Sequence, residues 1–177
     1  MQAPAIPATE ALRIATLHEL LVLDTPPESR FDIITAYASS QFNVAIALVS
    51  LVDFNRIWFK SACGLDTPEA TREGSLCSHA ICHDRVFEIA DARRDPRFVD
   101  SPLVVGEPHI VFYAGAPLVM ANGERVGTLC LIDRRPRWLD SWEREHLMAL
   151  AGLVAMELQG QSAADDFARL KKTPGLN

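Results

Sequence analysis

Positive charge is in short supply in this sequence: 17 lysines and arginines stand against 23 aspartates and glutamates, giving a net charge of −6. Proteins that bind nucleic acid through its phosphates need a basic surface. We therefore expect no nucleic-acid partner.

Long apolar runs are also missing. The longest, from Val44 to Val52 and interrupted by Ser50, is well short of the roughly 20 residues that cross a bilayer. The N-terminus lacks the basic segment and apolar run of a secretory signal. We expect a cytoplasmic protein with no membrane partner.

Cysteine is scarce, and glycine-rich motifs are absent. In a reducing compartment the four cysteines are expected to be thiols rather than disulfides: Cys63, Cys77, Cys82 and Cys130. There is no GxGxxG motif or other glycine-rich phosphate loop, no internal repeat and no low-complexity segment. A glycine-rich phosphate site and a repeat architecture are therefore not indicated.

The composition that remains is typical of one globular domain, with 49% hydrophobic and 23% charged residues in 177. Both ends of the chain have the polar or proline-containing composition of tails. We expect an N-terminal tail over 1–8, a single domain with its flanking helices over 9–160, and a helix end and tail over 161–177.

Two helices are predicted near the N-terminus. The first follows Thr9, a residue suited to capping, and stops before Pro26. Its apolar positions are Leu12, Leu17, Leu20 and Leu21. The second places apolar residues three or four positions apart, as one buried helical face requires: Phe31, Ile34, Ala38 and Phe42.

The segment over 44–53 is rich in β-branched residues on both faces, which predicts a central strand. Alternating residues over 56–64 predict the second arm of a hairpin. The polar stretch 65–75 is predicted to be a loop. A short helix over 76–84 and a strand over 86–91 are predicted to follow.

A long excursion over 92–108 is expected to cover one face of the sheet, as ordered loops over binding sites often do. Two strands are then predicted, over 110–120 and 125–133. They are joined at Asn122-Gly123, the strongest short signal for a hairpin.

The last predicted element is a long helix beginning at Asp140, where Glu143 stands in the position that completes a capping box. The helix is expected to run toward Leu170. Gly160 is predicted to break it.

This order of elements resembles the GAF domain, and so do particular segments. They are LVSLVD, RIWFKSACGLD, SLCSHAI, FEIADARRDPRFVDSPLVVGEPHIVFYAGAPL and GERVGTLCLID, which resemble a bacterial branch of GAF sensor domains over about residues 10–160. The resemblance implies an α+β fold with an antiparallel sheet of five to six strands. The N- and C-terminal helices would lie on one face, with loops, short helices and a ligand cavity on the other.

In that branch the domain often precedes a histidine kinase or a diguanylate cyclase, as in two-component systems. No such effector follows within these residues. We expect the module to signal either to a separate partner or to an effector outside this sequence.

Polar and aromatic residues are expected to converge on the cavity. We predict a ligand-binding site of Ser75, Cys77, His79, Asp91, Arg97, Phe98 and Tyr113, with no catalytic residue, cofactor or metal. The alternative is structural: Asp91 and Arg97 would fasten the long loop, and Phe98 and Tyr113 would belong to the core.

One short segment gathers metal-ligand residue types: Cys77, His79, Cys82 and His83. It lacks the paired CxxC spacing of structural zinc sites, and a domain of this composition needs no metal to fold. We expect these side chains to line or cap the pocket instead.

Cys82-His83 also resembles the Cys-His pair that holds the chromophore in bilin-binding GAF domains. In those domains the pair follows the strand that ends here at Asp91. No cysteine lies between Asp91 and Tyr113, so a covalent bilin is not expected.

The main enzymatic alternative is a GAF-type free methionine sulfoxide reductase, which needs an activated thiolate and a resolving cysteine. Cys77 matches one of that family's cysteines. The family's catalytic thiol falls in the loop after Asp91, where this chain has no cysteine. We expect no enzymatic activity, with Cys63, Cys77 and Cys130 acting as small buried hydrophobes.

The function expected is that of a sensor, which binds an unidentified small molecule or responds to redox state and signals through helix contacts. A GAF domain that only dimerises is a further hypothesis. The helix from Asp140 carries apolar residues on several faces, so we predict a homodimer whose contact includes Leu153 or Met156.

Overall fold

Six strands form one antiparallel sheet in the order β3-β2-β1-β6-β5-β4 in the computed structural model, which describes residues 3–172 and the side chains up to residue 160. The strands are β1 (Ile46–Val52), β2 (Arg56–Cys63), β3 (Glu69–Thr71), β4 (Phe87–Ile89), β5 (Phe112–Val119) and β6 (Arg125–Asp133). As the sequence predicts, β1 is central and buried on both faces.

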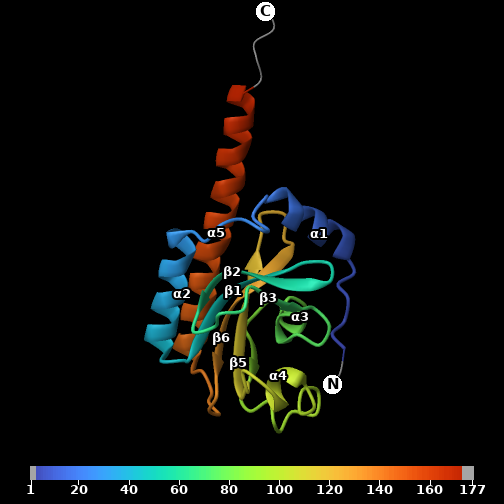
Figure 1. Cartoon of the computed structure of the whole chain (residues 1–177), viewed down its shortest axis with the longest axis vertical. Helices are drawn as coiled ribbons and strands as arrows, with labels where there is room; N and C mark the ends of the chain where they lie inside the picture. The colour runs from blue at the N-terminus through green and yellow to red at the C-terminus, as the bar shows by residue number, and fades with distance from the viewer. Residues whose placement is uncertain (1–2, 173–177) are drawn as a thin grey trace, which may run out of the picture.

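Five helices flank the sheet within the described residues, as Figure 1 shows. The long helices α2 (Ser29–Phe42) and α5 (Ser141–Lys172) cover one face, with α1 (Glu10–Glu19) at its edge. The short helices α3 (Leu76–Ala80) and α4 (Pro102–Val105) lie over the other face. This is the expected α+β GAF arrangement.

Two apolar layers result from the alternation of side chains along the strands. On β1, Ala47, Val49 and Leu51 face α2 and α5. The intervening Ile46 and Leu48 face α3 and the long loop. The second layer is therefore the one in which a cavity can form beneath loops.

The hairpin between β5 and β6 turns at the predicted Asn122-Gly123. The backbone amide of Met120 donates to the carbonyl oxygen of Glu124 over 2.9 Å, and Gly123 has a φ of 86°. Because that backbone conformation strains residues with a Cβ, glycine suits this position.

The start of α5 is fixed by the predicted capping box. The Glu143 amide donates to the Asp140 carboxylate over 2.7 Å, and the Asp140 amide donates to the Glu143 carboxylate over 2.8 Å. Two backbone donors without partners inside the helix are thereby satisfied.

Four expectations were wrong in detail. The stretch 65–75 contains the short edge strand β3, which pairs with β2. Helix α5 continues through Gly160 to Lys172, because one glycine costs a helix only about 1 kcal/mol. The long excursion 92–108 contains the short helix α4. In α1, the side chain of Arg13 is buried and that of Leu12 is exposed, because Arg13 has hydrogen-bond partners in Glu10 and Val52.

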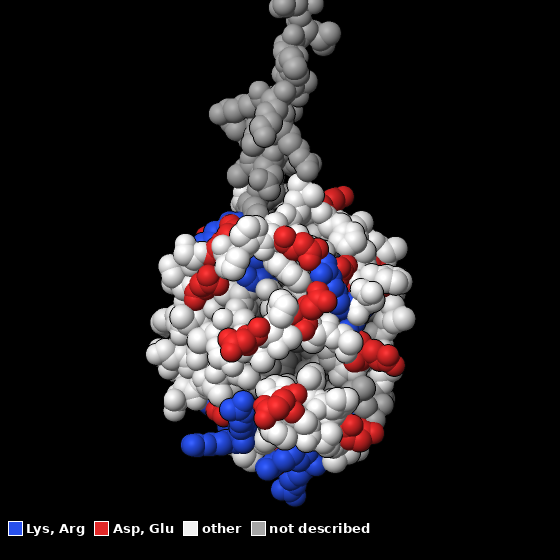
Figure 2. Space-filling model, viewed as in Figure 1, with Lys and Arg blue, Asp and Glu red and all other residues white. Residues whose placement is uncertain are grey.

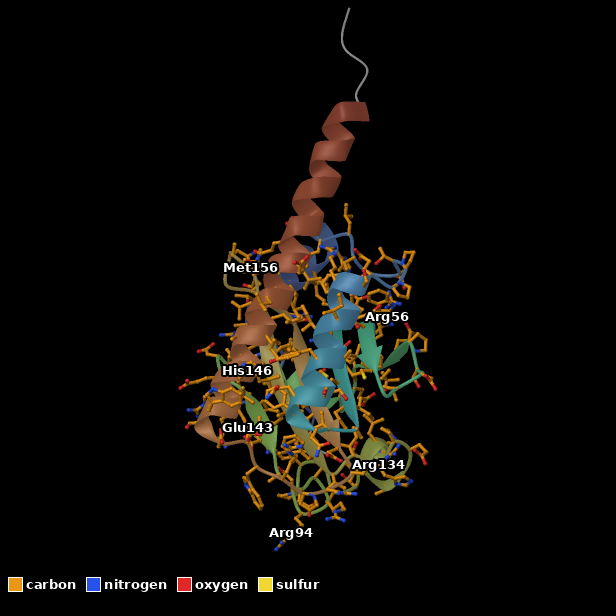
Figure 3. All side chains as sticks on the ribbon, turned by 90° about the vertical axis from the view of Figure 1, so that its left-hand side faces the viewer. Arg56, Arg94, Arg134, Glu143, His146 and Met156 are labelled. Atoms are coloured by element: carbon orange, nitrogen blue, oxygen red, sulfur yellow. The ribbon has the colours of Figure 1, made fainter. Side chains whose placement is uncertain are left out.

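Helix α5 presents exposed apolar side chains beside α2, and Figure 3 labels Met156 and His146 along it. Leu153 is 50% exposed and Met156 is 67% exposed. Among residues 3–172, no helix combines the length and apolar character needed to cross a membrane.

Candidate functional site

A cavity of about 320 Å³ lies between the sheet and the segments that cover its α3 side. Its buried lining is mostly apolar and comes from both the sheet and the covering segments: Ile46, Leu48, Ile57, Leu76, Ile110 and Ile132. The volume is at the lower end of the range for small-molecule pockets, about 300–1,000 Å³. The cavity is therefore large enough for a small ligand.

The charged residues of the lining stand at the mouth. Asp66, Glu107 and Arg134 all line the cavity and are all exposed. Arg134 donates from Nε to the carbonyl oxygen of Pro108 over 2.9 Å, which holds its side chain against the long loop. On the face viewed in Figure 2, acidic side chains are scattered, and basic side chains lie both near the lower end and in the upper half.

Tyr113 on β5 lines the inner end of the cavity and is fully buried. Its ring extends along β5 past Gly115, where a Cβ would overlap the Tyr113 hydroxyl. Glycine at 115 therefore leaves room for this tyrosine to lie flat against the sheet. The sequence AGAPL supplies that space between two buried alanines.

A cluster of polar side chains lies beside Tyr113 within the apolar layer, and we call it the thiol cluster: Ser50, Cys77, Tyr113, Thr128 and Cys130. The sheet register pairs Ser50 with Thr128 and Leu48 with Cys130. Directly paired residues share a face, so β1 and β6 present these polar groups together. Ser50 Oγ lies 3.6 Å from Cys130 Sγ.

Cys77 approaches the cluster from α3, which packs on β5 and β6. The pKa of Cys77 is lowered to about 6, and the largest cause is a hydrogen bond from Cys130. Burial opposes this lowering. The hydroxyls of Tyr113, Thr128 and Ser50 lower the pKa further. The contact with Cys77 and burial both raise the pKa of Cys130. Cys130 therefore keeps its proton and donates it toward Cys77.

Two hydroxyls of the cluster lack a well-directed hydrogen bond among the described residues, namely Tyr113 Oη and Thr128 Oγ1. Burial raises the pKa of Tyr113 well above its ordinary value, so this hydroxyl stays protonated. Buried hydroxyls without a partner are costly, by about 1–3 kcal/mol each. Both hydroxyls lie within reach of the Cys77 sulfur, whose pKa they lower, and a hydroxyl can rotate to donate to it.

Three of the seven residues predicted to bind ligand line the cavity: Ser75, Cys77 and Tyr113. The Ser75 hydroxyl also caps α3, accepting from the Ser78 amide over 3.0 Å. Sequence proximity and the turn before α3 bring Ser75 and Cys77 together. The fold adds Tyr113 from a strand far along the chain.

The other four predicted residues, His79, Asp91, Arg97 and Phe98, lie outside the lining of this cavity. Phe98 is buried, with the His79 ring edge-on at 4.8 Å. Arg97 pairs with Asp95 over 2.6 Å and covers the Phe98 ring. The Asp91 carboxylate accepts from Arg93 over 2.7 Å. These contacts order the long loop beside the site.

The segment with several metal-ligand residue types is spread out in the structure. The Cys82 thiol donates to the carbonyl oxygen of Ala5 over 3.3 Å, and His83 stacks on Phe87 at 5.0 Å. No group of three or more His, Cys, Asp or Glu side chains is placed to hold a metal ion within the part of the chain that the structure describes.

Sequence reasoning missed Ser50, Thr128 and the association of Cys130 with Cys77. The available signal was a polar residue inside each of two apolar strands, LVSLV and GTLCL. Such residues face either layer of the core, and only the strand register shows which of them become neighbours.

In the comparison with known families, the GAF domain profile matches residues 26–158. A cyclic di-GMP phosphodiesterase of Pseudomonas aeruginosa is 47% identical over 137 residues. That match covers 77% of this chain but only 23% of the relative. The similarity is therefore confined to one part of a much longer protein.

Solved structures with low sequence identity share the fold. The blue-light-absorbing PixJ GAF domain of Thermosynechococcus elongatus has a TM-score of 0.65 at 14% identity, covering 97% of this chain and all of its own (100%). The free methionine-R-sulfoxide reductase of Neisseria meningitidis has a TM-score of 0.63 at 18% identity, with 93% and 99% covered. A domain of a two-component sensor histidine kinase protein from Sinorhizobium meliloti has a TM-score of 0.61 at 16% identity, with 80% and 96% covered.

Proposed function

The chain belongs to the GAF domain family, and we propose that it is a sensory module that binds a small molecule in the cavity at Tyr113. The observation that carries the proposal is an apolar cavity with a polar inner end and a charged mouth. Binding pockets combine apolar walls with a few placed polar groups in this way.

The cavity offers a ligand apolar walls and a polar group at its inner end. The apolar part of the ligand contacts the isoleucine and leucine walls, while a polar group reaches the Tyr113 hydroxyl, which is buried without a well-directed partner among the described residues. A hydrogen bond from ligand to Tyr113 would remove that cost. Arg134 at the mouth is placed to contact a polar group left outside.

The output of the module is proposed to be an effector enzyme. The Pseudomonas relative joins a similar segment to a cyclic di-GMP phosphodiesterase. A histidine kinase or a cyclase is the other class of effector that we propose. The domain from the Sinorhizobium meliloti sensor histidine kinase protein, which has the same fold, supports the kinase. The signal would pass to either through α5, which Figure 1 shows extending beyond the sheet.

We propose that α5 also forms a homodimer contact. Leu153 and Met156 are exposed, while Val154 and Leu158 of the same helix are buried against the sheet. A two-fold axis beside α5 would cover the exposed set. A change at the cavity would then reach the partner chain as a small shift of this helix.

Catalysis is not part of the proposal. The sulfoxide reductase alternative requires a thiol in the loop after Asp91, and residues 92–107 contain none. A domain that only dimerises is a second alternative, and it would leave the cavity without a role.

Native mass spectrometry of the protein purified from its own host tests the proposal. We expect a retained small molecule that is released on denaturation and that is lost from a Leu48→Trp variant, in which the indole fills the cavity. Val105→Trp, at an exposed position on α4, is the matched control and should retain it. A folded protein that retains nothing, and that no small molecule in a metabolite screen stabilises, would favour the dimerisation-only alternative.

A further inference from the structure

The thiol cluster places two buried cysteines and three hydroxyl groups inside an apolar layer of the core. Cys77 is 7% exposed and Cys130 is 0% exposed. Cysteines buried among apolar residues keep raised pKa values and are inert. Here Cys77 is surrounded by hydrogen-bond donors, so burial alone does not describe its chemistry.

The donors around Cys77 come from three strands. Cys130 and Thr128 belong to β6, Tyr113 to β5 and Ser50 to β1. The sheet register holds them in fixed positions. The Tyr113 and Thr128 hydroxyls lie near enough to the Cys77 sulfur to lower its pKa, and neither has another well-directed hydrogen-bond partner among the described residues.

The cavity gives a small molecule access to one of the two thiols. Cys77 is one of its lining residues, whereas Cys130 is fully buried and is not part of the lining. A molecule that enters the cavity therefore meets Cys77 first. The order of the two thiols from the cavity inward is that of an attacking and a resolving cysteine.

We propose that Cys77 and Cys130 form a peroxide-responsive thiol pair at the inner end of the cavity, with Cys77 as the nucleophile and Cys130 as the resolving thiol. The inference rests on the proposed function to the extent that the cavity is the route by which a small molecule enters. It adds a covalent modification site and a chemical class of input, hydroperoxides.

The chemistry balances in two steps. The Cys77 thiolate attacks one oxygen of hydrogen peroxide, the O–O bond breaks, and the departing hydroxide takes up a proton to become water. Cys77 is left as a sulfenic acid. The Cys130 sulfur then attacks the Cys77 sulfur, the S–O bond breaks, and the second water leaves with the Cys130 proton. Two thiols are oxidised by two electrons, and the peroxide is reduced to two waters.

The lowered pKa of Cys77, to about 6 through its hydrogen bonds with Cys130 and the three hydroxyls, supports this division of roles. The thiolate is the nucleophilic form. The raised pKa of Cys130 keeps the second thiol protonated until the sulfenic acid has formed.

The remaining cysteines provide an internal comparison. Cys82 is exposed and Cys63 is partly exposed. Burial raises the pKa of Cys82. If exposure decided reactivity, Cys82 would be oxidised first. The thiol cluster predicts the reverse order.

The test is oxidation of the fully reduced chain by equimolar hydrogen peroxide at pH 7, followed by alkylation with iodoacetamide, proteolysis and mass spectrometry. We expect an intrachain peptide pair linked through Cys77 and Cys130, formed roughly tenfold or more faster than any oxidation of Cys82. In a urea-unfolded sample this preference should disappear.

Two variants test the separate roles. Cys130→Ser should stop the reaction at the sulfenic acid of Cys77, which dimedone traps, and Cys82→Ser should leave the linked pair unchanged. If Cys130→Ser does not fold, the identification of the oxidised cysteines in the wild-type chain by mass spectrometry still tests the inference. Oxidation of Cys82 or Cys63 while Cys77 and Cys130 remain open to alkylation would overturn the inference. Because the mapping needs no retained ligand, its outcome is independent of the ligand-retention experiment.

Discussion

The buried Arg13 guanidinium donates a hydrogen bond of 2.6 Å to the carbonyl oxygen of Val52, thirty-nine positions along the chain. The same guanidinium donates to both carboxylate oxygens of Glu10. Arg72, from the segment before α3, donates to Glu10 over 2.6 Å. This network fastens α1 to the end of β1 and to the covering segment beside the cavity.

In Glu10→Gln, the free energy of unfolding should change less than in wild type as the pH falls from 7 toward 2. Burial disfavours the charged form of Glu10, but hydrogen bonds from Arg13 and Arg72 outweigh it and lower its pKa to about 2. Because the pKa of Glu10 is lower in the folded state, the charged carboxylate stabilises the fold at pH values above its unfolded pKa of about 4.3. This stabilisation is lost as the pH falls toward 2.

Urea unfolding should therefore show Glu10→Gln about 1–2 kcal/mol less stable than wild type at pH 7, with allowance for partial exposure. The gap should narrow by pH 3. Glu145→Gln, at an exposed position on α5, is the control and should show a small difference at both pH values. A gap of equal size at pH 7 and pH 3 would rule out the ion-pair explanation.

Gly115→Ala should disturb the inner end of the cavity. The added methyl group would overlap the Tyr113 hydroxyl, and overpacking a core costs about 1–3 kcal/mol. We expect that loss in urea unfolding, together with weaker ligand retention. Adding Tyr113→Phe removes the overlapping oxygen and should recover part of the stability. A Gly115→Ala variant as stable as wild type would show that Tyr113 is not held against β5.

Leu153→Glu combined with Met156→Glu should convert the proposed dimer to a monomer. Both positions are exposed in a single chain, so the double change should leave the fold intact while placing charges in the contact. Light scattering at micromolar concentration measures the state. Val105→Glu, on the opposite layer, should remain dimeric. A monomeric wild type, or a dimer that survives the double change, would exclude this contact.

The protein should not reduce free methionine sulfoxide. Cys77 lines the cavity, but residues 92–107 of the covering loop carry no thiol. A thioredoxin-coupled assay with free methionine-R-sulfoxide should show no turnover above the background without protein. Turnover that Cys77→Ser abolishes would establish the reductase alternative.

Removal of metal ions should leave the fold unchanged. In the described residues, no three potential ligands come together around one point. A metal that binds only the folded state would raise the melting temperature, so melting with and without a strong chelator should coincide. A large drop on chelation, with stoichiometric zinc by elemental analysis, would show a metal site.

The sequence alone determined most of the elements, because their signals are local; the short strand β3 and the short helix α4 were the exceptions. Asn122-Gly123 specifies a tight turn through backbone conformation, and Asp140 with Glu143 specifies a helix start through two reciprocal hydrogen bonds. The apolar runs of β1 and β6 likewise require burial on both faces. From these, together with the family resemblance, the order of helices and strands followed.

The site could be predicted only in part. Ser75 and Cys77 were identified because they stand together in the segment that leads into α3. Tyr113 was also identified, through its place on the fourth predicted strand. His79 and Phe98 were placed in the same set, but their rings pack on each other beside the long loop.

Only the tertiary structure decided that Ser50, Thr128 and Cys130 become neighbours of Cys77. They lie on different strands, and a shift of one residue in register would turn any of these strands' side chains to the opposite layer. Burial of Arg13 was decided in the same way, since its partner Val52 is a backbone carbonyl that only the folded chain brings within 2.6 Å. Local patterns specify which segments are buried; which polar groups meet inside is fixed by the packing of distant segments.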